Sequence, residues 1–402
     1  MNMWQWSEEQ GWRRPLAISF GFVLIAVFVI AGAMGVAAGV ALTGLLAIPS
    51  WTRLKSILPL ELPMAIFLVF IAWAWISMRW TTYPQSDQAW KMALGVLLYS
   101  MFAFAVFSLR GKARLLVLYV AAASLALILL VYFLEAAFGV ISNMYAEGLP
   151  RQEKLRDATR GISALVIAAP CAWAFSHILM PGWRGNAIAV SFGLIAFWIS
   201  WRFDLSSAML ALFIAGILFA LGWFFPRTII LLVGLAAVFM FMLAPIVAPI
   251  AVDILRSFDL PLSWEQRVDI WQFASERIAE RPMIGWGLDA SRSFDSTYIL
   301  HKLEFARIPL HPHNVGLQLW LETGLIGAIL FSTATIALAI RVSSSWNLSR
   351  LQGATISASS SAILVFSTLT YGAWQEWFWA SAAWVAAMCF LLGPPPDELV
   401  KS

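Results

Sequence analysis

The sequence predicts an all-α, polytopic membrane protein of about twelve transmembrane helices, with one large loop on the outer side of the membrane. Hydrophobic residues occupy 61% of the 402 positions and charged residues only 12%, whereas soluble domains carry about 25% charged residues. The mean hydropathy is +0.80. The chain has too few polar residues to cover soluble domains, so its remaining apolar surface is expected to face lipid.

The net charge of +4 is interpreted as a topology signal rather than as a nucleic-acid-binding surface. The basic residues stand in short clusters between apolar runs and do not form one basic face, so no nucleic acid partner is expected. The two cysteines, Cys171 and Cys389, lie within apolar stretches and are predicted to be small core residues.

Apolar runs of about 20 residues, the length that crosses a bilayer, recur along the chain. The first run, from Leu16 to Ile48, is long enough for two short spans, with a turn expected near Gly32, Gly35 and Gly39. It has no evident cleavage site, which favours retained helices over a signal peptide. Further spans are expected at 60–79, 88–108, 113–138, 160–180, 186–201, 206–224, 227–250, 314–340, 352–372 and 375–393.

The distribution of basic residues predicts that both termini are cytoplasmic. With that orientation, the inner loops hold Arg13, Arg14, Arg53, Lys55, Arg110, Lys112, Arg114, Arg184, Arg227, Arg341, Arg350 and Lys401. The expected organisation is transmembrane helices one to nine over 1–250, a periplasmic loop domain over 251–313, and three last spans over 314–402. A shorter polar stretch, 139–159, is also expected to be a loop on the outer side.

The loop 251–313 is predicted to contain an amphipathic helix. Ser263 is the expected N-cap, and Pro282 is expected to end the helix. Its apolar positions, at helical spacing, are Trp264, Val268, Trp271 and Ile278.

The first candidate for chemistry is His311-Pro-His313-Asn314, immediately before a predicted span. Asn314, Gln318 and Glu322 follow at intervals of four residues and therefore share one helical face. A histidine at the edge of such a polar stripe can act as a general base near neutral pH. Two alternatives stay open: a structural histidine bonded to backbone, or a metal ligand pair, although no nearby cysteine or acidic cluster completes a ligand set.

The second candidate is Arg267, one helical turn from Trp271. A guanidinium binds phosphate oxygens bidentately, and tryptophan is suited to sugar stacking or to anchoring at an interface. Arg160 and Arg202 are also predicted at outer helix ends. Three arginines on one side suit an anionic lipid headgroup such as a diphosphate, while the alternative for each is an ordinary solvated face.

The segment Arg281-Pro282-Met-Ile-Gly285-Trp-Gly287 is predicted to be a tight turn, and it lacks the Lys-Ser/Thr ending of a phosphate-binding P-loop. In chain order, Arg-x-x-x-Trp (267–271), Arg-Pro-x-x-Gly-x-Gly (281–287), His-x-His-Asn (311–314) and Glu-Thr-Gly (322–324) follow many spans. This order resembles the O-antigen ligase and polymerase superfamily of bacterial envelope glycosyltransferases. The resemblance is sharpest over 264–324.

The resemblance implies a GT-C-like helical fold in the bacterial inner membrane and glycosyl transfer on the periplasmic face. The donor would be a glycan on undecaprenyl diphosphate and the acceptor a lipid A–core sugar, with no metal or other cofactor and with inversion at the anomeric carbon. His313 would deprotonate the acceptor hydroxyl and Arg267 would hold the diphosphate. The residues expected to contribute to substrate binding are Arg160, Arg202, Trp271, His311, Asn314 and Glu322.

One feature departs from the family pattern. The family often has Ser-Arg directly before a small residue that starts a span, whereas this chain has Ser206-Ser207-Ala208, with Arg202 one turn earlier. The role of Arg202 therefore has weaker support than that of Arg267.

The resemblance leaves other functions open. A polymerase or a protein O-glycosyltransferase of the same superfamily would differ in the acceptor rather than in the chemistry. A transporter of lipid-linked glycans is a further alternative, but it predicts charged residues along a path through the membrane, and the predicted spans contain almost none.

Overall fold

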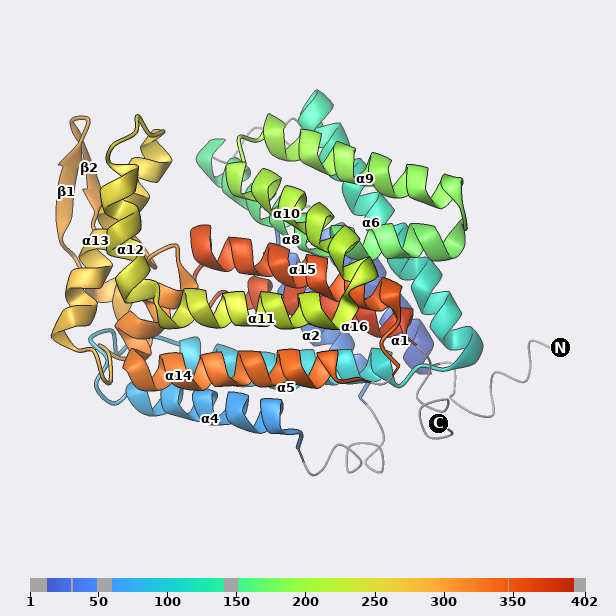
Figure 1. Ribbon diagram of the computed structural model, residues 1–402, viewed down its shortest axis with the longest axis horizontal. Coiled ribbons are helices and arrows are strands. Elements are labelled where there is room, and N and C mark those ends of the chain that lie inside the picture. The colour runs from blue at the N-terminus through green and yellow to red at the C-terminus, as the bar shows by residue number, and fades with distance from the viewer. Residues whose placement is uncertain (1–12, 30–31, 49–59, 141–150, 346, 394–402) are drawn as a thin grey trace.

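The computed structural model describes residues 13–29, 32–48, 60–140, 151–345 and 347–393. Over these ranges the chain forms fourteen α-helices and one short β-hairpin (Figure 1). Five helices are long and apolar enough to cross a membrane, and up to six if one bent pair counts as a single span. The chain is therefore a largely helical, multi-pass membrane protein, while the number of twelve spans stays a prediction.

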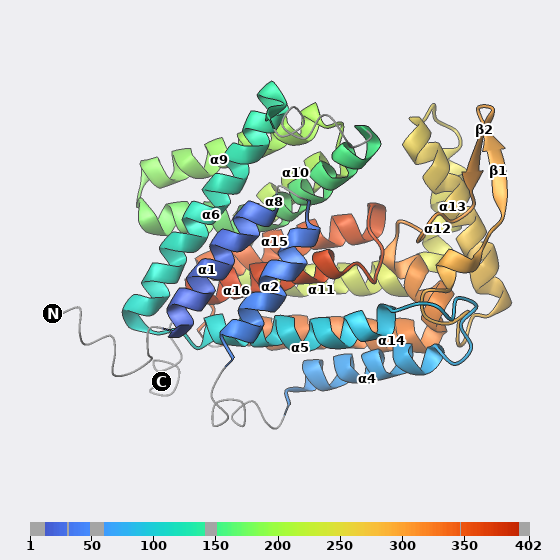
Figure 2. The same ribbon diagram turned by 180° about the vertical axis from the view of Figure 1, so that it is seen from behind.

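Each predicted span coincides with a helix or a pair of helices. These are α1 (Arg13–Phe28), α2 (Met34–Leu46), α4 (Leu62–Ser77), α5 (Gln88–Phe107), α6 (Gly111–Phe138), α8 (Arg151–Leu179), α9 (Trp183–Arg202), α10 (Ser206–Phe224), α11 (Pro226–Met242), α12 (Ala244–Leu255), α14 (Val315–Ser343), α15 (Arg350–Leu369) and α16 (Glu376–Leu392). Figure 2 shows α1, α2, α5 and α6 from behind, beside the other helices of the bundle.

Of the three glycines expected at the first turn, only Gly32 lies at it, with a φ of +83°. Gly35 and Gly39 lie inside α2 and face α1. A Cβ on Gly35 would stand 2.4 Å from the Phe28 Cβ, and one on Gly39 would stand 2.7 Å from the Ile25 Cγ1. These two glycines therefore allow close packing of two helices rather than a turn.

Three predicted boundaries are wrong. The expected span 227–250 is broken, because α11 and α12 meet at an angle of 81°. The expected loop start at 251 lies within α12. The polar stretch 139–159 was expected to be a loop, but α8 begins at Arg151, which the charged composition of the segment disguised. Helix α12 and helix α13 (Leu262–Glu280) lie across one end of the bundle (Figure 1, left).

The segment between α12 and α14 contains more than the predicted helix. Helix α13 ends at Glu280, before Pro282 as predicted, and Val268, Trp271 and Ile278 are buried. Its N-cap is Pro261, and Ser263 lies inside the first turn without capping it. A 3-10 turn (Ala290–Ser293) and an antiparallel hairpin follow, formed by β1 (Thr297–Leu300) and β2 (Leu303–Ala306). This hairpin is the one departure from an all-α fold within the described residues.

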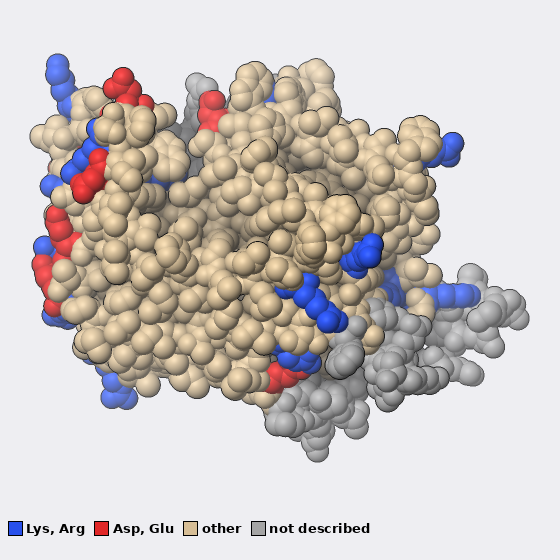
Figure 3. Space-filling view, in the orientation of Figure 1, with Lys and Arg blue, Asp and Glu red and all other residues tan. Residues whose placement is uncertain are grey.

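The surface agrees with a membrane protein that has two polar ends. On the face shown in Figure 3, charged side chains gather at the end that carries α13 and the hairpin and toward the opposite end. A broad surface without charge lies between them. Helix faces that point outward from the bundle expose large apolar side chains, including Leu232 and Leu235 on α11. Such a surface is suited to contact with lipid.

Helix α14 is interrupted where the Glu-Thr-Gly sequence occurs. Gly324 has a φ of +66° and a ψ of −169°, which is not helical. A break of this kind leaves backbone carbonyls and N–H groups without their helical partners, and such groups are costly to bury unpaired.

The turn 282–287 supplies the missing partners. The N–H groups of Trp286 and Gly287 donate to the carbonyls of Leu321 and Glu322, at 2.8 and 2.9 Å. In the other direction, the Leu325 N–H donates to the Pro282 carbonyl at 2.8 Å. The Arg-Pro-x-x-Gly-x-Gly and Glu-Thr-Gly motifs therefore form one structural unit.

Glycine is required on both sides of this unit. A Cβ on Gly324 would stand 2.3 Å from the Met283 carbonyl oxygen, and one on Gly285 would stand 2.6 Å from the Glu322 carbonyl carbon. Both residues have a positive φ, which side chains disfavour.

We expect Gly324→Ala to lower the free energy of unfolding by about 1–3 kcal/mol, because alanine is strained at this φ and collides with the 282–287 turn. SDS titration in mixed micelles, followed by circular dichroism, measures the change. The matched control is Gly216→Ala in α10, where an added Cβ has no atom within 4 Å. Equal stability of the two variants would contradict this account of the break.

Candidate active site

Three segments that are distant in sequence meet around the buried carboxylate of Glu322. Two of them, the loop domain between α12 and α14 and the loop between α15 and α16 (370–375), bind the carboxylate directly. The third, the loop after α4 (78–87), joins them through the Ser86 hydroxyl, which donates to Asp289. Glu322 is fully buried, and its carboxylate accepts four hydrogen bonds. The donors are the Asp289 N–H (2.6 Å), the Ser291 hydroxyl (2.5 Å), the Gln318 amide (3.0 Å) and the Trp374 indole N–H (2.5 Å).

The rest of the predicted polar stripe also binds protein. The Asn314 side chain caps α14 by accepting from the Leu317 N–H, and it donates to the Thr368 carbonyl, each at 3.0 Å. The Gln318 amide oxygen accepts from the Ala373 N–H at 2.7 Å. The three polar residues share one helical face, as predicted, and this face is turned toward the end of α15 and the loop that follows it.

The loop that carries the two histidines is fixed to α13 by Trp271. The indole N–H of Trp271 donates to the Pro312 carbonyl at 3.1 Å, and the ring is buried. Trp264 packs edge-on against it, with ring centroids 6.5 Å apart. This contact places Arg267, one turn before Trp271, on the same side of the helix as the histidine loop.

His311 is buried with both ring nitrogens engaged. Its Nδ1 accepts from the His313 N–H at 3.1 Å, so the neutral ring carries its proton on Nε2. The Gln375 amide lies 2.9 Å from Nε2, and an acceptor orientation of this amide completes the ring's hydrogen bonds. Burial, with the charges of His313, Arg292 and Arg160, lowers the pKa of His311 well below its usual value. His311 is therefore a neutral residue that positions its neighbours.

His313 differs because one ring nitrogen is available. Its Nδ1 lies 2.8 Å from the Thr370 carbonyl, which can only accept, so Nδ1 carries the proton and Nε2 has a free lone pair. The backbone of His313 has a φ of +56°, an uncommon conformation for a residue with a side chain. Burial is the main cause that lowers the pKa of His313, and the charge of Arg267 contributes, so the ring is neutral near pH 7.

Arg267 provides positive charge beside His313. Its guanidinium lies 5.1 Å from the centre of the Trp264 ring and donates to the Ser263 carbonyl at 3.2 Å. Burial lowers the pKa of Arg267, but the group keeps its charge. Within the described ranges it has no carboxylate partner, and its Nε is buried without a hydrogen-bond acceptor.

Arg160 and Tyr371 complete the group around the histidines. Arg160 pairs with Asp157 at 3.6 Å, and its charge acts on both His311 and Tyr371. The Tyr371 hydroxyl lies 2.7 Å from the Ser163 hydroxyl of α8. Burial raises the pKa of Tyr371 to about 12, while the charges of Arg160 and Arg267 lower it, so the phenol stays protonated.

Arg202 makes no hydrogen bond or ion pair with this group within the described residues. It stands at the end of α9 and its Nε donates to the Ala136 carbonyl of α6 at 3.3 Å. It is not among the charges that act on either histidine or on Tyr371.

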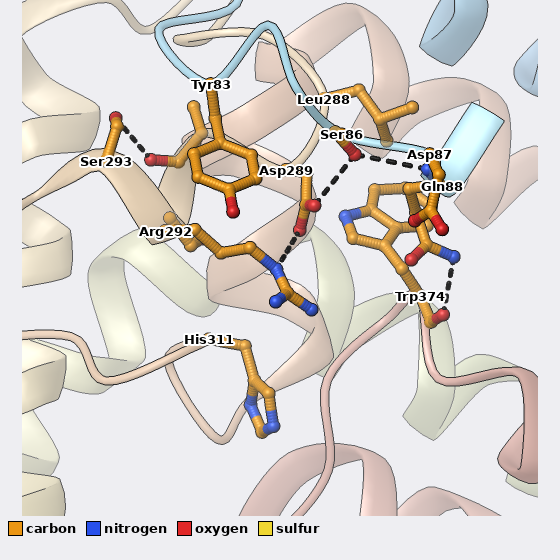
Figure 4. Close-up of polar contacts among 12 residues, drawn as sticks. Tyr83, Ser86, Asp87, Gln88, Leu288, Asp289, Arg292, Ser293, His311 and Trp374 are labelled. Atoms are coloured by element: carbon orange, nitrogen blue, oxygen red, sulfur yellow. Dashed lines mark hydrogen bonds and ion pairs between the residues drawn. The ribbon is translucent and has the colours of Figure 1, made fainter.

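Sequence reasoning missed Arg292, Asp289 and Tyr371. Arg292 donates through Nε to Asp289 at 2.8 Å, and its guanidinium extends toward His311 (Figure 4). Asp289 has a positive φ of 63°, a backbone feature that is visible in the structure but not in the sequence. Arg292 falls just after the Arg-Pro-x-x-Gly-x-Gly turn, which was the one available signal.

Within the residues that the structure describes, no group of three or more His, Cys, Asp or Glu side chains is arranged to hold a metal ion. His311 and His313 have ring centroids 4.5 Å apart, but the ring nitrogens of His311 are occupied by protein groups. The arrangement can hold an anion with arginines and can take a proton on His313 Nε2.

The fold and site define a multi-pass membrane protein with a histidine–arginine centre at one end of its helices. Residues 203–332 match the family model described as O-antigen ligase. This match spans the loop domain, both histidines and the Glu-Thr-Gly break.

The curated relatives agree with this match. A protein named "putative polysaccharide ligase" in Rickettsia conorii is 27% identical over 356 residues, which cover 85% of this chain and 82% of the relative. A protein of the same description in Rickettsia typhi is 24% identical, over 82% of this chain and 80% of the relative. One in Rickettsia bellii is 34% identical over 143 residues, or 34% of each chain. No solved structure matches the chain.

These matches agree with the resemblance drawn from the motifs: the chain is similar to the O-antigen ligase family over residues 203–332, and to proteins named putative polysaccharide ligase over most of its length.

We expect Glu322→Gln to lower the free energy of unfolding by about 1–3 kcal/mol, because the amide NH₂ would face N–H and O–H donors in a buried site. SDS titration of the purified protein measures this change. The matched control is Glu304→Gln on the exposed hairpin, where the carboxylate accepts only from Thr297 among the described residues. A Glu322→Gln variant as stable as this control would show that the four hydrogen bonds do not hold the segments together.

Proposed function

We propose that this protein is an O-antigen ligase that transfers a polysaccharide from undecaprenyl diphosphate to a sugar hydroxyl of lipid A–core, completing lipopolysaccharide. The observation that carries the proposal is the free Nε2 of His313 beside the uncompensated charge of Arg267. Similarity to the O-antigen ligase family supports the reaction class, and the names of the rickettsial relatives point to a polysaccharide as the transferred group.

The proposed reaction is a single displacement. The acceptor hydroxyl gives its proton to His313 Nε2, and its oxygen bonds to the anomeric carbon of the donor. The bond from that carbon to the diphosphate oxygen breaks, and the diphosphate leaves with the electron pair. His313 then holds both ring protons, and the Thr370 carbonyl stabilises the imidazolium through the Nδ1–H bond. Attack from the side opposite the leaving group inverts the anomeric configuration.

Arg267 would supply most of the charge that the leaving diphosphate needs, and Arg160, which is paired with Asp157, would contribute less. Fixed guanidinium groups in a partly buried site stabilise developing negative charge more strongly than water does. Arg267 fits this role because it is half-buried, stacked on Trp264 and not neutralised by a carboxylate in the described ranges. With the charge supplied in this way, the transfer is proposed to be independent of metal ions.

The other predicted substrate-binding residues have different proposed roles. Trp271, Asn314, Glu322 and His311 contact protein groups and are proposed to position the histidine loop. Arg202, whose Nε donates to the Ala136 carbonyl, is proposed to contact the lipid-linked donor outside the reacting centre.

The site lies at one end of the helices, where a donor and an acceptor that are both held in lipid can meet. We propose that this is the periplasmic end, in the bacterial inner membrane, with both termini cytoplasmic. The distribution of basic residues supports this orientation.

In an assay with purified protein, an undecaprenyl-diphosphate glycan, lipid A–core and EDTA, we expect transfer by the wild type. His313→Ala should reduce the rate by about 10²–10⁴-fold because the general base is lost. Arg267→Ala should reduce it by about 10²–10³-fold through loss of charge stabilisation.

Two matched controls are His301→Ala and Lys302→Ala, which remove a histidine and a cation from the exposed hairpin turn. Both should keep the wild-type rate. Full activity of His313→Ala or Arg267→Ala would overturn the assignment of the site, and a longer lipid-linked glycan as the product would identify a polymerase instead.

The pH dependence tests the role of His313 separately. A general base acts only when unprotonated, so activity is lost as the pH falls through its pKa. Burial and Arg267 lower the pKa of His313 below its usual 6.5, so the acid limb of kcat/KM should have its midpoint below that value. A midpoint above 6.5, or an unchanged limb in a residually active His313→Ala variant, would assign the limb to another group.

A further inference from the structure

Arg292 is held in a defined orientation by groups from two distant segments. Its Nε donates to Asp289 Oδ1 at 2.8 Å, while Asp289 Oδ2 accepts from the Ser86 hydroxyl at 2.8 Å. The Asp289 backbone N–H donates in turn to Glu322. The Asp289 side chain is 7% exposed and that of Arg292 is 39% exposed. The buried carboxylate therefore fixes one edge of a guanidinium whose other edge is open.

The open edge faces His311, which lies beside the proposed base His313. Figure 4 shows the Arg292 guanidinium extending toward His311, with the Tyr83 ring beside the arginine side chain. Nη1 and Nη2 of Arg292 have no recorded acceptor in the described part of the chain. Burial is the main cause that lowers the pKa of His311, and the charge of Arg292 contributes to the shift. Two directed N–H donors are therefore presented to whatever lies over the histidine pair.

We propose that Arg292 is the acceptor-side anion subsite, which binds a phosphate or carboxylate group on the acceptor sugar. This inference rests on the proposed function, because it requires an acceptor whose hydroxyl lies at His313. An acceptor in that position would extend past His311 to reach Arg292. Tyr83 would provide an apolar ring face for the same sugar.

The charge balance favours the acceptor, rather than the donor diphosphate, as the group that Arg292 binds. Arg267 has no carboxylate partner in the described residues and is suited to neutralise a multiply charged leaving group. Arg292 and Asp289 together carry no net charge, so this pair gives directional hydrogen bonds rather than strong charge neutralisation.

The subsite is tested by steady-state kinetics with three lipid A–core acceptors: the native form, an enzymatically dephosphorylated form and a carboxyl-reduced form. Arg292→Ala should raise the KM for the native acceptor about tenfold or more, the loss expected for hydrogen bonds to a charged group. The KM for the undecaprenyl-diphosphate donor and kcat should stay within about twofold of wild type. For the wild type, the KM should rise with the modified acceptor that lacks the bound anion. For Arg292→Ala, the KM should be the same with this modified acceptor as with the native acceptor.

Arg292→Lys, which keeps the charge but loses the fork of donors, should give an intermediate KM for the native acceptor. Lys302→Ala is the matched control for removal of a cation from the loop domain and should behave as wild type. Unfolding in SDS confirms that each variant is folded.

The outcomes separate the two proposals. A rise in the donor KM, a fall in kcat alone, or unchanged kinetics in Arg292→Ala would overturn the acceptor-side subsite while leaving the ligase intact. A wild-type protein that transfers glycan to none of the acceptors would overturn the proposed function, and the subsite with it.

Discussion

The buried carboxylate of Glu322, together with the break in α14 beside it, is the constraint on which the geometry of the site depends. The carboxylate binds backbone or side chains of the loop domain, α14 and the loop after α15. The break at Gly324 lets the 282–287 turn pair with the interrupted helix, so the loop domain is fixed to the bundle through main-chain bonds. Backbone groups at a broken helix need hydrogen-bond partners when water is excluded. The glycines of the two motifs allow the turn and the helix to come close enough to supply these partners.

The two histidines in the loop before α14 have different environments. His311 is enclosed by the His313 N–H, Gln375 and the glycine at 372, where an added Cβ would stand 2.7 Å from the His311 Cγ. Among the described residues, His313 makes a single ring hydrogen bond, to the Thr370 carbonyl, and this bond fixes its tautomer. Positive charge is distributed in the same way: Arg267 is uncompensated in the described ranges, whereas Arg292 is matched by Asp289. The proposed site therefore combines a base, His313, with an anion-binding arginine, Arg267, and a directional donor, Arg292.

Hydropathy predicted most of the helices, because the lipid-facing surface dictates long apolar runs, and the order of motifs predicted the similarity to the O-antigen ligase family. The sequence could not show the bend between α11 and α12 or the hairpin 297–306, since local composition did not distinguish them from a continuous span and a loop. The stripe Asn314–Gln318–Glu322 was correctly placed on one face, but its neighbours, Thr368, Ala373 and Trp374, lie more than 50 positions away. Tyr371 and Arg292 were missed for the same reason: their roles arise only from contacts made across the fold.

The central claim is that a hydroxyl activated by His313 displaces the diphosphate in one step, with Arg267 opposing the charge that leaves. The most direct measurement is the anomeric configuration of the new glycosidic bond, determined by NMR on the transfer product and compared with that of the lipid-linked donor. A single displacement predicts inversion at the anomeric carbon. Retention would require a covalent glycosyl intermediate, for which His313 would have to be a nucleophile rather than a base, and it would contradict this account.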